Sequence, residues 1–192
     1  MKTKTFILFL GLTLVLFSCQ NRDWSNPFDP DCPKESFTPR NFKAEQQGNV
    51  VKLTWTQSNN QISGFKIERK VAGGSWAEVA SPGKSISVWN DEKLINDKLH
   101  EYRLYSYAGQ NESNKISTQI TPKIPPIAIT LPASNVTTTS ATLNGTVNAN
   151  GVSTAVTFEY GETTAYGQSV SASPSPITGS GATTVGAAIS GL

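Results

Sequence analysis

Apolar and polar residues alternate in short runs along residues 38–123, and Gly, Asn, Ser and Pro separate these runs. In residues 51–56 the odd positions are apolar and the even positions are polar, and residues 65–69 repeat the pattern. Alternation with a period of two over segments this short is typical of antiparallel strands with one buried face. A segment of about 85 residues is long enough for one small β-sandwich with a single core. We therefore predict strands, and no helix, in this part of the chain.

Residues 124–192 alternate in the same way but are rich in Thr, Ser, Gly and Ala, and residues 141–148 and 156–161 predict two further strands. Residues 34–123 contain 13 basic and 9 acidic side chains, whereas residues 124–192 contain no Lys or Arg and only two acids, Glu159 and Glu162. Surfaces this different indicate two domains, over residues 38–123 and 124–192, with a Pro-rich junction between them.

Residues 1–18 have the pattern of a secretory signal peptide. Two lysines precede an apolar run over residues 6–17, and Ser18 follows as the small residue before the cut. A membrane span would need about 20 apolar residues. Cys19 directly after the small residue resembles the lipobox of bacterial lipoproteins, in which cleavage between Ser18 and Cys19 leaves an acylated cysteine as the first residue. The resemblance implies a protein anchored to a membrane by lipid on Cys19.

Residues 19–37 are predicted to be the lipidated cysteine and a flexible tether. Residues 26–33 are dense in Pro, Asp and Asn, which set turns and extended geometry. This stretch resembles a motif that follows the lipid cysteine in Gram-negative lipoproteins with β-sandwich domains. Gln20, where inner-membrane lipoproteins often carry Asp, implies the outer membrane, with the periplasmic face and the cell surface both open.

No metal site or cofactor is predicted. Asp23, Asp29 and Asp31 do not have the spacing of a loop that wraps calcium, so we interpret them as an acidic linker. One His and two Cys offer no zinc spacing, and lipid on Cys19 would exclude a disulfide to Cys32. After cleavage the chain holds 14 basic and 14 acidic residues, and this neutrality argues against nucleic acid as a partner.

Segments of the first domain resemble strands of a fibronectin type III domain. Residues 53–55 are similar to strand B, whose tryptophan, here Trp55, lies buried between the sheets of that family. Residues 64–69 are similar to strand C, 89–91 to strand E and 102–107 to strand F. The resemblance implies an all-β fold of tandem fibronectin type III sandwiches.

One position departs from the family pattern. In the family a tyrosine six residues after a leucine bonds back to the backbone, and six residues after Leu94 this chain has His100. We expect His100 to take the structural role of that tyrosine through a ring nitrogen, because a catalytic role would need a nucleophile or metal partner that the sequence does not show.

Three aromatic side chains are candidate ligand contacts. If even positions of residues 100–106 face inward, Tyr105 and Tyr107 point outward beside Arg103. Outward tyrosines can stack on sugars or anchor a partner protein, but more often they are cross-strand pairs that cover a sheet, and we favour this second interpretation. Trp76, after two glycines near a hairpin, carries the same two interpretations.

The second domain is expected to be incomplete. Gly145 and Leu192 fall at the places that Trp55 and Leu94 hold in the first domain, so two further strands would follow Leu192. We therefore expect a fragment of a longer protein.

The leading functional hypothesis is a non-catalytic, lipid-anchored envelope protein whose sandwiches serve as spacers or as binding modules for a protein or glycan. The alternatives are the N-terminal stalk of an extracellular hydrolase and a glycan-binding accessory lipoprotein. No phosphate loop, nucleophile elbow or paired-carboxylate motif is recognisable in residues 20–192.

Overall fold

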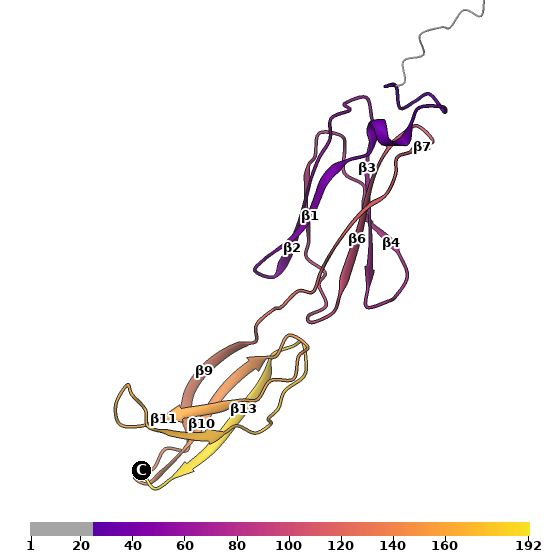
Figure 1. The fold of residues 1–192 in the computed structure, drawn as a ribbon. Helices are drawn as coiled ribbons and strands as arrows, with labels where there is room; N and C mark the ends of the chain where they lie inside the picture. The colour runs from indigo at the N-terminus through magenta and orange to yellow at the C-terminus, as the bar shows by residue number, and fades with distance from the viewer. Residues whose placement is uncertain (1–24) are drawn as a thin grey trace, which may run out of the picture.

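The computed structural model describes residues 25–192, which form two β-sandwiches joined end to end by a short linker (Figure 1). The first module contains a 3₁₀ turn, η1 (Lys34–Phe37), and strands β1 (Arg40–Gln47), β2 (Val50–Thr56), β3 (Gly64–Val71), β4 (Ala77–Ala80), β5 (Val88–Asp91), β6 (His100–Ala108), β7 (Asn111–Glu112) and β8 (Ile116–Ile120). The second contains β9 (Ile127–Ser134), β10 (Ser140–Asn148), β11 (Thr157–Tyr160), β12 (Gln168–Ser171) and β13 (Thr183–Ser190).

Two antiparallel sheets enclose the core of the first module. One has the order β1-β2-β5, and in the other β3 lies between β4 and β6 while β7 and β8 pair with β6. Strands β2 and β3 cover the segments that the alternation predicts, and β5 and β6 cover those that the fibronectin type III resemblance implies as strands E and F. Trp55 of β2 is buried between the sheets and meets the Phe65 ring edge-on at 5.4 Å.

The second module has the sheet β13-β10-β9 and the two-stranded sheet β11-β12. Its core is lined by Ala, Val and Ile side chains and by Phe158 of β11. Gly145 of β10 faces this core, where an added Cβ would lie 3.4 Å from the Phe158 ring and 3.0 Å from the carbonyl oxygen of Ile129. The absence of a side chain at Gly145 thus admits Phe158, whereas in the first module Trp55 fills the corresponding place beside Phe65.

The segment before β1 is docked on the first module, which corrects the expectation of a flexible tether up to residue 37. Phe37 is 1% exposed, and Cys32 is buried in the same core cluster. The side-chain amides of Asn111 and Asn59 donate to the carbonyls of Pro27 (2.9 Å) and Ser25 (2.8 Å). The apolar surface of Phe37 is the physical reason, because its burial outweighs the turn-forming composition around it.

Between residues 25 and 192 the structure contains no helix long and apolar enough to cross a membrane.

Candidate functional site

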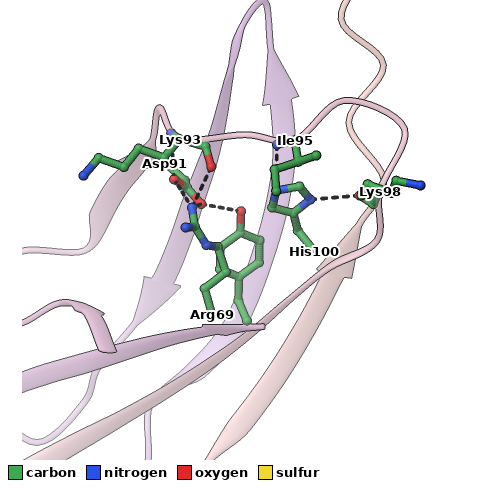
Figure 2. A network of polar contacts seen from close by, with 7 residues as sticks. Arg69, Asp91, Lys93, Ile95, Lys98 and His100 are labelled. Atoms are coloured by element: carbon green, nitrogen blue, oxygen red, sulfur yellow. Dashed lines mark hydrogen bonds and ion pairs between the residues drawn. The ribbon is translucent and has the colours of Figure 1, made fainter. Parts of the chain in front are cut away.

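A buried polar network ties together β3, β5 and β6 at the end of the first module that lies nearest the linker (Figure 2). Asp91, at the end of β5, is 2% exposed. Nη1 of Arg69 lies 2.8 and 2.7 Å from the two carboxylate oxygens of Asp91 and also donates to the Lys93 carbonyl. The Tyr102 hydroxyl donates to Asp91 at 2.8 Å, and the Lys93 N–H at 3.0 Å. Burial, reinforced by the Asp91 carboxylate, raises the pKa of Tyr102 well above its ordinary value, so the hydroxyl stays a donor.

His100 holds the other end of the same loop, residues 92–99 (Figure 2). The Ile95 N–H donates to Nε2 of His100 at 3.2 Å, and Nδ1 lies 2.8 Å from the Lys98 carbonyl oxygen. Because Nε2 accepts, Nδ1 carries the proton and donates. The ring is fully buried. Leu94 of this loop also packs against the core, so the loop is fixed by side chains from inside the sandwich.

This fixed loop presents Asn96 and Asp97 to the linker. The Asn96 amide donates to the Ile124 carbonyl at 2.7 Å and accepts from the Ile124 N–H at 2.8 Å. The Asp97 N–H donates to the Pro122 carbonyl at 2.9 Å, and the Asp97 carboxylate pairs with the Lys123 ammonium. The hydrogen bond from Lys123 and its charge lower the pKa of Asp97 below the ordinary value.

Two more side-chain amides hold the linker. Gln46, at the end of β1, donates to the Lys123 carbonyl at 3.0 Å and accepts from the Lys123 N–H at 2.9 Å. From the second module Asn150 donates to the Pro125 carbonyl at 2.6 Å. We call Gln46, Asn96, Asp97 and Asn150 the linker clamp. Together they bind the carbonyls of four successive linker residues, 122–125.

The second candidate region is the outer face of the sheet that contains β3 and β6. Register places Lys66 opposite Tyr105, Glu68 opposite Arg103 and Lys70 opposite Glu101. Tyr107 of β6 lies over Gly64, where an added Cβ would be 3.2 Å from its ring. The alternation of charged and aromatic side chains along β6 therefore places cations and aromatic rings on one face of the sheet.

Tyr105 lies on this outer face but is only 4% exposed, which corrects the expectation of a ligand-facing ring. The Lys115 ammonium sits 4.4 Å from the ring centroid, and Glu68 accepts from the hydroxyl at 3.5 Å. Burial, together with the charges of Glu112, Glu68 and Glu78, raises the pKa of Tyr105 to about 12. Tyr105 is thus a covered cross-strand residue, and Tyr107 is half-buried with the Lys66 ammonium 6.0 Å from its ring centroid.

Trp76 lies in the connection between β3 and β4, and two cationic side chains cover its ring. The Arg103 guanidinium carbon is 3.8 Å from the Trp76 ring centroid, and the Lys70 ammonium is 5.0 Å from it. Cations over an indole face are attracted by its π electrons. The sequence indicates that Arg103 lies on the same face of its strand as Tyr105 and Tyr107. It does not indicate that β6 pairs with β3, which is the pairing that brings Trp76 next to Arg103.

Ser18 and Cys19, the predicted cleavage and lipidation residues, lie outside the described residues. Over residues 25–192 the structure brings no three His, Cys, Asp or Glu side chains into a group that would hold a metal ion.

No protein-family model matches this chain, and no curated protein matches it. Among solved structures, a two-domain fibronectin type III segment of chicken tenascin aligns over 81% of this chain and 83% of its own, with a TM-score of 0.52 and 11% identity. A computationally redesigned β-sandwich protein aligns over 45% of this chain and 90% of its own at 21% identity, with a TM-score of 0.42. The twitchin kinase region of C. elegans aligns over 44% of this chain and 16% of its own at 22% identity, with a TM-score of 0.38. The tenascin alignment shows the fold: the chain is all-β, built of β-sandwiches like those of tandem fibronectin type III domains.

Proposed function

We propose that this protein is a lipid-anchored envelope protein whose two sandwiches form a stiff, non-catalytic spacer. The observation that carries the proposal is the linker clamp. A linker of six residues with free backbone groups would let two domains reorient, because interdomain motion is the default where few contacts cross. Here side chains from both modules bind the linker backbone, so the distance between the two ends of the molecule is held nearly constant.

The composition of the linker supports the same role. Pro122, Pro125 and Pro126 have fixed φ angles and no backbone N–H. The two N–H groups between Pro122 and Pro125, those of Lys123 and Ile124, are both bound by clamp amides. Three of the four clamp residues are uncharged amides at pH 7, so salt does not screen their contacts.

The stiffness is tested by small-angle X-ray scattering on the secreted Cys19→Ala form. We expect one narrow distribution of interatomic distances, unchanged between low and high salt. The triple variant Gln46→Ala/Asn96→Ala/Asn150→Ala should broaden that distribution, whereas Gln110→Ala/Gln168→Ala, which removes exposed amides outside the clamp, should not. The proposal of a stiff spacer is contradicted if the scattering of the parent protein can be fitted only by many different orientations of the two modules.

The anchor is tested by expressing the full chain in a Gram-negative host. We expect the mature protein in the membrane fraction, with an acylated Cys19 as its first residue by mass spectrometry. Cys19→Ala should release the protein, while the matched variant Cys32→Ala should stay in the membrane fraction. An unacylated N-terminus in the parent protein would refute the anchoring half of the proposal and leave the stiffness test intact.

A further inference from the structure

Arg103 differs from the other cations on the outer face of the first module. Three lysines there are paired with acids: Lys66 with Glu78, Lys70 with Glu101 and Lys115 with Glu68. Within residues 25–192 no hydrogen bond or ion pair joins the Arg103 guanidinium to a protein acceptor. The guanidinium instead lies over the Trp76 ring, with its carbon 3.8 Å from the ring centroid. A guanidinium has five N–H donors, so this half-buried group has its hydrogen-bonding capacity available.

The Trp76 ring holds this guanidinium in a fixed orientation. Stacking occupies the flat face of the group and leaves the edges, where the N–H donors lie, directed away from the ring. A fixed fork of this kind matches the two oxygens of a carboxylate, because two parallel N–H···O bonds form without further ordering of the side chain. Lys70, 5.0 Å from the same ring, adds positive charge beside the fork.

The surroundings of Arg103 form a shallow depression of about 240 Å³. Its walls include Ser117 and Gln119 of β8, which register places opposite Arg103 and Glu101 of β6. A hydroxyl and an amide beside the fork can each donate and accept hydrogen bonds. Glu101 also lines the depression, with one of its oxygens 2.7 Å from the Lys70 ammonium.

Glu101 narrows the class of ligand. The Glu101 carboxylate, two residues from Arg103 on β6, repels a second anionic group inside the depression, so the part of the ligand that lies there carries a single carboxylate. The same carboxylate accepts hydrogen bonds from hydroxyl groups, as do Ser117 and Gln119. A ligand with one carboxylate and several hydroxyls satisfies all of these groups at once.

We propose that this depression binds a uronic-acid unit of an acidic polysaccharide, with the sugar carboxylate on the Arg103 fork and its hydroxyls on Ser117, Gln119 and Glu101. The site gives the first module a ligand in addition to its place in the spacer. It does not depend on acylation or on the linker clamp.

The test is affinity electrophoresis of the Cys19→Ala protein in gels that contain polygalacturonate, with fully methyl-esterified polygalacturonate as the uncharged ligand control. We expect the acidic polymer to retard the protein and the ester not to. Arg103→Gln should weaken the apparent affinity by about tenfold or more, because a charge-assisted bidentate contact is lost. Arg103→Lys keeps the charge without the fork and should recover only part of it.

Arg40→Gln is the matched control, since it removes the same charge from an exposed position on β1. It should change the affinity by less than about twofold if binding is local rather than a property of net charge. An unchanged far-UV circular dichroism spectrum and an unchanged urea midpoint will show that Arg103→Gln is folded; its tryptophan emission is not used for this, because Arg103 contacts Trp76. The proposal is overturned if the acidic polymer does not retard the parent protein, if the ester retards it equally, or if Arg40→Gln and Arg103→Gln weaken retardation alike.

Discussion

Replacing Arg69 with Met will destabilise the first module far more than removing an exposed cation from the same strand. Arg69 contributes the positive charge that faces buried Asp91, at 2.7 Å in the closer contact. Without it the carboxylate keeps the Tyr102 hydroxyl and the Lys93 N–H as donors but loses its counter-charge. Breaking a buried ion pair from one side typically reduces the free energy of unfolding by about 3–5 kcal/mol.

That loss is large beside the total stability of a domain, which is on the order of 5–15 kcal/mol. Lys66→Met is the matched control, because Lys66 is also on β3 and its pair with Glu78 is open, at 3.6 Å with side chains 34% and 48% exposed. Exposed pairs contribute about 0–1 kcal/mol. Burial, and not the number of charges removed, therefore sets the difference between the two variants.

The assay is urea unfolding followed by tryptophan fluorescence. Trp55, Trp76 and Trp89 lie in the first module and residues 124–192 contain no tryptophan, so the change in emission on unfolding reports the first module even though the chain has two. Arg69→Met should lower the urea midpoint strongly while Lys66→Met leaves it nearly unchanged. Equal midpoints for the two variants would refute the reasoning, since they would mean that Asp91 does not need its counter-charge.

Three further outcomes are expected. Phe37→Ala should destabilise the first module by about 3–5 kcal/mol in the same assay, because it empties a core position. Phe28 is exposed, so Phe28→Ala should change the free energy of unfolding by no more than about 0.5 kcal/mol. Equal effects of the two variants would mean that residues 25–37 are not docked on the module. The pKa of Tyr105 is about 12 in the folded protein and 10 in the free side chain, so the unfolded chain releases this proton first. The free energy of unfolding should therefore be unaffected by this group below pH 10 and fall as the pH rises towards 12. Tyr105→Phe should reduce that fall in urea unfolding, and an unchanged pH dependence would contradict the prediction. Ile129 is 57% exposed on the edge strand β9. Ile129→Lys should therefore reduce concentration-dependent association in sedimentation velocity without lowering the stability of the second module. Identical sedimentation of the parent protein and the variant would show that this edge does not self-associate.

The fold was accessible from the sequence because the alternation around Trp55 and Phe65 repeats the period of a strand wherever one face is buried. The same reasoning misplaced residues 25–37, since their Pro, Asp and Asn content describes local turns while a single buried phenylalanine decides where the segment packs. Period-two counting also put Tyr105 on the correct face but could not show that Lys115, from the segment just before β8, covers it.

The candidate sites were less accessible for a related reason. Gln46, Asn96 and Asn150 are ordinary surface residues in the sequence, 50 and 54 positions apart, and only the ends of β1, of the loop before β6 and of the second module bring them to one linker. Likewise, Arg103 and Trp76 become neighbours through the pairing of β3 with β6, which alternation within a single strand does not specify.

The linker clamp also bears on how the protein resists proteolysis. Proteases of the trypsin class cleave after Lys or Arg, and Lys123 is the last such residue in the sequence. The peptide bond that follows it has its carbonyl bound by Gln46 and its N–H bound by Asn96, and the lysine side chain is held by Asp97. Residues 124–192 therefore contain no bond that an enzyme of this class would cleave, and the Lys123–Ile124 bond just before them is shielded by the clamp.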